Sequence, residues 1–219
     1  MAVWLSILQL IFSVDASAHG SDKFKSTRWV DLKELRPTQF NVGMGEVEFK
    51  RARFEKMGKK KLREYLHKKV ARVIVGPKAA AHGAYLWLID GHHTATALSF
   101  LQGSEMRILV EHDWSHLNVA DFFKRMIERN KTWLFDNGLG PLNVNDLPAT
   151  LAHLSDDPYR TLAWRVKEDN GFLKTDGEYA EFKWADFFRT RVAPSDLNRA
   201  WRLARSPEAS HLPGYISGQ

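Results

Sequence analysis

The chain has 219 residues, of which 44% are hydrophobic and 26% are charged. This composition is typical of one globular domain, or of one domain with a C-terminal extension, and it excludes a wholly disordered or collagen-like chain. The absence of cysteine excludes disulfides, thiolate zinc sites, iron–sulfur clusters and cysteine nucleophiles. A formal net charge of +6 favours anionic partners but says nothing about the fold.

The first 27 residues have part of the character of a secretory signal. Residues 2–14 form an apolar run, and residues 16–18 resemble a small-residue cleavage site. No Lys or Arg precedes the run, and the run is short for a membrane span. Two interpretations stay open. The segment is either a cleaved signal peptide of an exported protein, periplasmic or secreted, or a loose extension of a cytoplasmic one. No other segment has the character of a membrane span, so none is expected in the mature chain.

Residues 28–117 are predicted to form a small mixed α/β (α+β) domain. Residues 29–35 indicate a short strand and a helical turn, followed by a loop bounded by Pro37. Residues 57–69 are expected to be helical, from the spacing of their apolar residues. Further strands are predicted at 70–75, 84–89 and 106–111, with a helix at 94–102 that ends at Gly103.

Residues 118–219 are predicted to form a helical region packed on this domain. Helical signals cover residues 119–131, a start at 155–159, residues 182–188 and residues 195–204. The aromatic residues of the last third are expected in the core rather than on a base-stacking surface, because amphipathic helices bury such stripes: Trp164, Trp184, Phe187, Phe188 and Trp201.

The positive charge is concentrated in one segment. Residues 48–78 contain twelve Lys and Arg against three Glu, a charge of +9, which leaves −3 for the rest of the chain. Such a concentration suits contact with phosphate or nucleic acid. The alternative is a solvated helix face, because Lys and Arg are good helix formers on exposed surfaces.

A turn between a strand and a helix, Asp90-Gly-His-His-Thr94, is the most informative feature of the sequence. Gly91 allows a tight turn and a close approach of a ligand. A helix that begins near Thr94 directs its free N–H groups and positive dipole end at the turn, which favours an anion. His92 and His93 can donate to phosphate oxygens, and Thr94 or Thr96 adds a hydroxyl. The alternative is an N-capped helix with two incidental histidines.

Metal binding is predicted only at Asp90, which ends a strand and can hold an ion or orient a histidine. Mg²⁺ or Mn²⁺ held by Asp90 and one glutamate is the expected form. A zinc site is not favoured, because His112 and His116 follow a strand and have no Glu between them.

Six segments in order along the chain carry a resemblance to a known family: Arg36-Pro-Thr-Gln39, Val42-Gly-Met44, Glu46-Val47, Lys50-Arg-Ala-Arg53, Asp90-Gly-His-His93 and Asp156-Asp-Pro-Tyr-Arg-Thr-Leu-Ala-Trp164. They resemble the ParB-like putative nuclease family of the ParB/sulfiredoxin superfamily. The resemblance covers residues 30–189, which is most of the chain. It implies a small sheet-and-helix domain of that superfamily, here with a helical C-terminal extension.

The resemblance also implies a nucleotide site. The turn at residues 90–94 is similar to the turn where ParB proteins hold a nucleoside triphosphate and sulfiredoxins hold ATP phosphates. Gly91, His92 and His93 match it, whereas the Arg that usually follows is Thr94. Arg36 and Gln39 match a box that packs near the nucleotide. The cysteine of sulfiredoxins would fall at His92, which excludes their chemistry, and no helix-turn-helix module of ParB is recognisable.

Three functions follow from the sequence. The first is a nuclease or phosphotransferase that uses His92 or His93 as acid or base, Asp90 for a metal, and Glu46 or Glu48 as a second carboxylate. Its phosphate charge would be neutralised by three residues of the basic segment: Lys50, Arg51 and Arg53. The second is a non-catalytic module that holds a nucleotide or DNA. The third is an exported protein that acts on a small anionic substrate.

Overall fold

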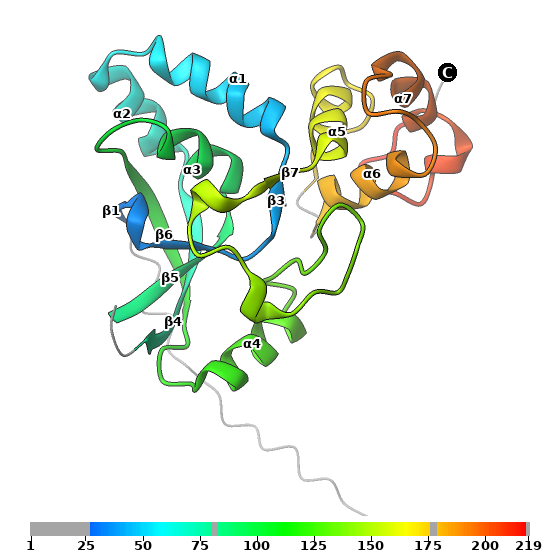
Figure 1. The fold of residues 1–219 in the computed structure, drawn as a ribbon. Helices are drawn as coiled ribbons and strands as arrows, with labels where there is room; N and C mark the ends of the chain where they lie inside the picture. Colours follow the sequence, from blue (N-terminus) through cyan, green and yellow to red (C-terminus); the bar gives the residue numbers. More distant parts are fainter. Residues whose placement is uncertain (1–26, 80–82, 176–178, 218–219) are drawn as a thin grey trace, which may run out of the picture.

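The computed structural model describes residues 27–79, 83–175 and 179–217 (Figure 1). The predicted signal peptide or extension therefore lies outside the described residues, except for Thr27. Among the described residues, no helix is long and apolar enough to cross a membrane.

A five-stranded mixed sheet forms the centre of the larger part of the molecule, in the order β1-β6-β4-β5-β2. Its strands are β1 (Thr27–Asp31), β2 (Leu35–Pro37), β4 (Ala71–Ala79), β5 (Gly83–Asp90) and β6 (Glu105–Asp113). β4 pairs antiparallel with β5 and parallel with β6, and β2 lies parallel to β5 at the edge. The expected loop at Pro37 is thus an edge strand, where proline is tolerated because no partner needs its N–H. β4 also continues through Gly76-Pro77, with a register shift at that point.

Helices cover both faces of this sheet because alternate strand residues point to opposite sides. Val73 and Leu88 face the core beneath α1 (Met44–Glu55), α2 (Lys59–Lys68) and α3 (His92–Ser99). Ile74 and Trp87 face α4 (Val119–Glu128) on the other side. α3 begins at His92 rather than near Thr94, so both histidines lie inside its first turn.

The C-terminal helices have a hydrophobic core of their own. α5 (Pro158–Glu168), α6 (Ala180–Arg189) and α7 (Leu197–Ala204) pack around buried Trp184, Phe187 and Phe188, as expected for a core stripe. The same expectation is wrong for Trp201, which is exposed on α7, and Trp164 is only partly buried. The remaining short elements are the strands β3 (Asn41–Val42) and β7 (Ser155–Asp156) and the 3-10 helices η1 (Leu32–Glu34), η2 (Val144–Asp146), η3 (Leu151–His153) and η4 (Pro207–Ala209). β3 and β7 pair in parallel and connect the two parts, beside the start of α1 (Figure 1). The fold is therefore mixed α/β with a helical C-terminal part, which confirms the predicted class.

Candidate functional site

The start of α1 lies directly against the start of α5, and two glycines allow this approach. A Cβ at Gly43 would lie 2.7 Å from the Thr161 nitrogen, and one at Gly45 would lie 2.4 Å from Thr161 Cγ2. The N–H of Gly45 donates to Thr161 Oγ1 at 3.0 Å, and the N–H of Met44 donates to Asp156 Oδ1 at 2.8 Å. The first turn of α1, which carries Glu46, is therefore fixed beside α5.

His93 connects the first turn of α3 to the start of α1. Its Nε2 accepts the Gly43 N–H at 3.1 Å, and its Nδ1 lies 3.6 Å from Glu46 Oε2. Burial lowers the pKa of His93 to about 4, although the Glu46 carboxylate acts in the opposite direction. A neutral imidazole that accepts at Nε2 carries its proton on Nδ1. His93 therefore directs an N–H at Glu46 and has no free lone pair to take a proton.

Glu46 and Glu181 place two carboxylates close to His93. Glu46 Oε1 accepts from Lys50 at 2.6 Å, whereas its Oε2 is buried and has no hydrogen-bond partner among the residues that the structure describes. Glu181, in the first turn of α6, accepts from Lys167 of α5. Burial alone would raise the pKa of Glu181, but Lys167, His93 and Arg160 together lower it to about 2. Each of the two carboxylates is thus paired with a neighbouring lysine.

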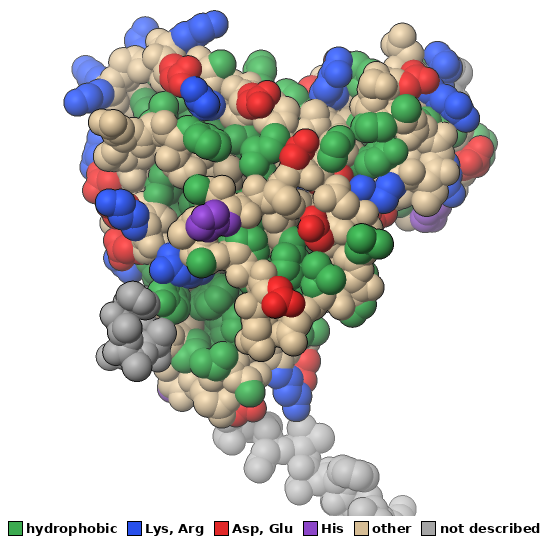
Figure 2. Space-filling model, viewed as in Figure 1, with side chains coloured by type: hydrophobic (Ala, Val, Ile, Leu, Met, Phe, Trp, Pro, Cys, Tyr) green, Lys and Arg blue, Asp and Glu red, His purple; other side chains and the backbone are tan. Residues whose placement is uncertain are grey.

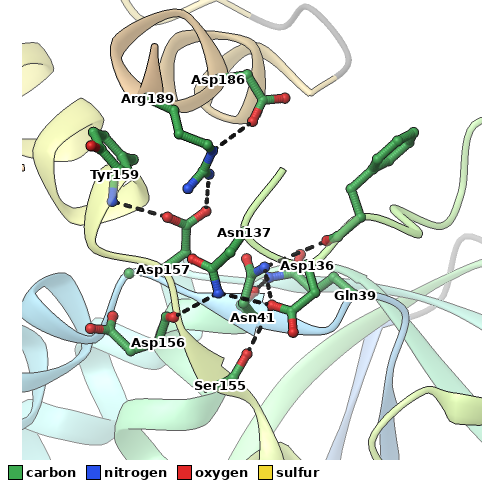
Figure 3. Close-up of polar contacts among 12 residues, drawn as sticks. Gln39, Asn41, Asp136, Asn137, Ser155, Asp156, Asp157, Tyr159, Asp186 and Arg189 are labelled. Atoms are coloured by element: carbon green, nitrogen blue, oxygen red, sulfur yellow. Dashed lines mark hydrogen bonds and ion pairs between the residues drawn. The ribbon is translucent and has the colours of Figure 1, made fainter. Parts of the chain in front are cut away.

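Arg160 is a buried cation beside this group. It is 3% exposed, its guanidinium lies 3.5 Å over the Phe182 ring, and its Nε and Nη1 have no hydrogen-bond acceptor among the described residues. Burial lowers its pKa, while four carboxylates act against this effect. Each of the four is held by another cation: Glu46 by Lys50, Glu181 by Lys167, and Asp157 and Asp186 by Arg189 at 2.7 and 3.5 Å (Figure 3). Arg160 is therefore surrounded by negative charge but bonded to none of it.

A second polar network fixes the backbone next to Arg160. Asp136 Oδ1 accepts from Asn41 at 3.0 Å, from Asn137 at 3.1 Å and from Ser155 at 3.1 Å (Figure 3). Asp157 caps α5 by accepting the Tyr159 N–H at 3.0 Å. These bonds hold β3, β7 and the start of α5 in one rigid arrangement.

Glu46, His93 and Glu181 also satisfy the distance requirement of a metal site, because each offers a ligand atom within 4.8 Å of the others. Their bonding opposes this use. Lys50 and Lys167 already neutralise the two carboxylates, and His93 Nδ1 keeps its proton as long as Gly43 donates to Nε2. The residues fit an anion at Arg160 better than they fit a cation between the carboxylates.

His92 has a structural place in the fold. Its Nε2 accepts the Thr38 N–H at 3.3 Å. Burial, with His93 and Arg160 nearby, lowers the pKa of His92 to about 3. The ring is buried and bonded to the backbone just after β2 through its Nε2. This bond opposes the predicted roles of His92 in phosphate binding and proton transfer.

The other predicted residues of the turn lie outside the group around Arg160. Asp90 is exposed at the end of β5, and Glu48 is exposed on α1. Gly91 has φ +98°, and a Cβ there would lie 3.2 Å from Ala71 Cβ, so backbone conformation and packing on the sheet require the glycine. Thr94 and Thr96 are buried within α3.

Most of the predicted basic and amide residues also lie outside the group around Arg160. Arg36 stacks on Tyr85 at 4.5 Å, and Gln39 donates to the Asn41 carbonyl at 2.5 Å. Arg51 pairs with Glu55 at 2.8 Å, and Arg53 lies 5.1 Å over Tyr65. Of the predicted phosphate-binding residues, only Lys50 lies in the group with Glu46 and His93.

The basic segment forms an outer surface of the molecule. Figure 2 shows Lys and Arg side chains along the upper left edge, over α1 and α2. The first turn of α2 contains Lys59, Lys60 and Lys61 and no acidic residue. Positive charge at a helix N-terminus is opposed by the macrodipole, so this arrangement costs stability unless an anion is present.

Sequence reasoning missed the residues that complete the group. Arg160 lies in the segment 156–164 that carries part of the family resemblance, but nothing in the segment alone shows that its guanidinium is unbonded. Lys167 and Glu181 are ordinary charged residues of amphipathic helices in the sequence. Only the packing of α5 and α6 against α1 and α3 brings them to Glu46 and His93.

The chain is similar to a known protein family and to a solved structure. A family model described as "Putative ParB-like nuclease" matches residues 28–190, a range that includes Glu46, His93, Arg160 and Glu181. A solved structure, "Crystal structure of protein Atu1540 from Agrobacterium tumefaciens", is similar with a TM-score of 0.79 and 32% sequence identity. That similarity covers 89% of this chain and 98% of the other. No curated protein gives a significant match.

Proposed function

Because the chain belongs to the Putative ParB-like nuclease family, as its motifs predicted, we propose that it binds a phosphate-containing ligand at Arg160 and hydrolyses a phosphate ester there. The ligand is a nucleotide or a nucleic acid. The observation that carries the proposal is the pair of buried, unbonded donors on Arg160.

An anionic ligand explains why Arg160 keeps these donors. Each buried donor without an acceptor costs about 1–3 kcal/mol, and more when it is charged. Four carboxylates are close enough to act on Arg160, yet each of them bonds another cation. A guanidinium can donate to phosphate oxygens through several of its N–H groups. A phosphate would therefore satisfy donors that the protein itself leaves unbonded.

Glu46 is the residue with the properties of a base for hydrolysis. Its Oε2 is buried and unbonded, and His93 directs an N–H at it from 3.6 Å. In the proposed step, Glu46 takes a proton from water, the water oxygen bonds to phosphorus, and the ester oxygen leaves. Lys50, 2.6 Å from Glu46, supplies the proton that the leaving oxygen takes in this proposal. His93 is a positioning residue in this scheme, because it has no free lone pair.

The basic surface over α1 and α2 supports a second candidate, a nucleic-acid-binding module without catalysis. The three lysines at the start of α2 oppose the helix dipole and suit contact with a phosphate backbone. This candidate predicts an affinity for nucleic acid that falls steeply with salt. Affinity that is equal at low and moderate salt would contradict it.

The proposed function is tested by binding and hydrolysis assays on the full chain. Thermal shifts with inorganic pyrophosphate, nucleotides and a short oligonucleotide measure binding, because a ligand of the native state raises its stability. Release of phosphate or of cleaved fragments measures hydrolysis, with EDTA and with Mg²⁺ or Mn²⁺ in parallel. Glu46→Gln should bind normally and lose hydrolysis.

Two results would overturn the proposal. If none of these ligands shifts the unfolding temperature of the wild type, no phosphate site exists at Arg160. If the wild type binds but does not hydrolyse any of them under either metal condition, the catalytic half fails and the binding module remains. The third function, an exported protein acting on a small anion, stays a prediction, because its main support is the segment before residue 27.

A further inference from the structure

An aromatic cluster lies directly beside Arg160, and we propose that it stacks the base of a nucleotide whose phosphate Arg160 binds. The cluster consists of Trp133, Phe135, Tyr179 and Phe182. The inference rests on the proposed phosphate site and deepens it, because it assigns the base of the nucleotide to a specific group of rings.

The rings form a continuous group that begins at the guanidinium. Arg160 lies 3.5 Å from the Phe182 ring centre, and Phe182 lies 4.5 Å from that of Trp133. Trp133 also contacts Tyr179 at 4.8 Å and Phe135 at 5.2 Å. Only one ring therefore separates Trp133 from the unbonded donors of Arg160.

Trp133 is held in place by the backbone next to the site. Its N–H donates to the Thr38 carbonyl at 2.9 Å, and the residue forms a bridge with Gln39. Thr132 Oγ1 donates to the same Thr38 carbonyl at 2.8 Å, and the Tyr179 hydroxyl donates to the Thr132 carbonyl at 2.9 Å. A ring that is already fixed in the folded protein stacks a base more strongly, because binding then costs no further conformational entropy of that side chain.

This cluster differs from the aromatic core of the C-terminal helices. Trp184 is fully buried, stacks on Phe172 at 4.2 Å and donates its indole N–H to the Pro213 carbonyl at 2.8 Å. All four rings around Trp133 are partly exposed, and the Trp133 indole N–H has no hydrogen-bond partner in the described part of the chain. Figure 2 shows hydrophobic side chains at the surface over the loop that follows α4.

A nucleobase fits this pattern better than an aliphatic or peptide group does. Bases stack on aromatic side chains and on arginine planes, and they arrive covalently joined to a phosphate. The site has a contact for each part of a nucleotide: partly exposed rings for the base and, beside them, the unbonded donors of Arg160 for the phosphate. A sugar phosphate without a base would contact only the Arg160 donors.

Titration calorimetry with two classes of ligand of equal phosphate charge tests the inference. Each of the four nucleoside 5′-monophosphates is compared with ribose 5-phosphate, on the wild type, on Trp133→Leu and on Trp201→Leu. Trp201 is a matched control, since it is 36% exposed on α7 and lies outside the cluster. We expect at least one nucleotide to bind about tenfold tighter than ribose 5-phosphate, which is the size of one stacking contact. Trp133→Leu should remove that difference, and Trp201→Leu should keep it.

The affinity of Trp133→Leu for ribose 5-phosphate serves as the check on its folding and should equal that of the wild type. If every nucleotide binds the wild type no tighter than ribose 5-phosphate does, the stacking inference is wrong and the phosphate site stands. If a tighter nucleotide keeps its advantage in Trp133→Leu, the base lies elsewhere and the inference is again wrong. If neither the nucleotides nor ribose 5-phosphate bind, the proposed function is wrong, and so is the inference that rests on it.

Discussion

Replacement of Arg160 by methionine separates a functional arginine from a structural one. Two buried donor nitrogens without acceptors cost about 2–6 kcal/mol together, at about 1–3 kcal/mol each. Methionine removes that cost and fills a similar volume. It also loses the cation–π contact with Phe182, worth about 2 kcal/mol when desolvated, and the attraction of the surrounding carboxylates. We therefore expect the unfolding free energy of the ligand-free protein to stay equal or to rise by about 1 kcal/mol.

Arg189→Met provides the matched control in the same region. Arg189 bonds Asp157 at 2.7 Å, and the Asp157 side chain is only 4% exposed. Removal of its partner leaves a buried carboxylate unpaired, which costs about 3–5 kcal/mol. Urea unfolding of the two variants and the wild type, without ligand, gives the three free energies directly. A loss of more than 2 kcal/mol in Arg160→Met would refute the reasoning, because the arginine would then be bonded in solution.

Three further predictions concern the same site. The unfolded chain protonates His92 and His93 below pH 6.5, whereas the folded chain keeps them neutral down to about pH 3 and 4. The free energy of unfolding should therefore fall as the pH drops from 6.5 to 4, by up to about 1.4 kcal/mol per pH unit for each histidine. Equal urea midpoints at pH 7.5 and pH 5 would contradict this pH dependence. Gly45→Ala should lower the free energy of unfolding by about 1–3 kcal/mol, because the new Cβ would lie 2.4 Å from Thr161 Cγ2. Thr161→Ser removes that methyl group and should restore most of the loss in the double variant. A double variant as unstable as the single one would exclude this clash. His93→Gln can still accept the Gly43 N–H and direct an N–H at Glu46, so it should retain more hydrolysis than His93→Leu. Equal rates would remove the positioning role of His93.

The sequence predicted those parts of the fold that depend on short-range pattern. The strands around residues 70–75, 84–89 and 106–111 and the aromatic core of α6 follow from apolar spacing over a few residues. The start of α3 was less predictable. Gly91 takes the left-handed conformation at the N-cap, so the helix begins at His92 and turns both histidine rings toward the protein.

The candidate site was only partly predictable, because its residues meet through long-range packing. Glu46, Lys50 and His93 came from motifs along the chain, and the structure brings these three together. Arg160 and Glu181 reach them from helices more than sixty residues away in sequence, and no local pattern shows which arginine will lack an acceptor. The role of His93 could not be read from the sequence either, since it depends on the Gly43 N–H that occupies Nε2.

The most direct measurement of the central claim is the ¹⁵N–¹H resonance of Arg160 Nε, assigned as the signal that Arg160→Met removes. Nε–H is unbonded in the protein without ligand. The account predicts that titration with pyrophosphate or a nucleotide moves this signal downfield as the N–H gains a phosphate acceptor, while the Arg189 Nε signal stays in place. A signal that keeps its position when the protein is saturated with ligand would contradict the assignment of Arg160 as the phosphate-binding residue.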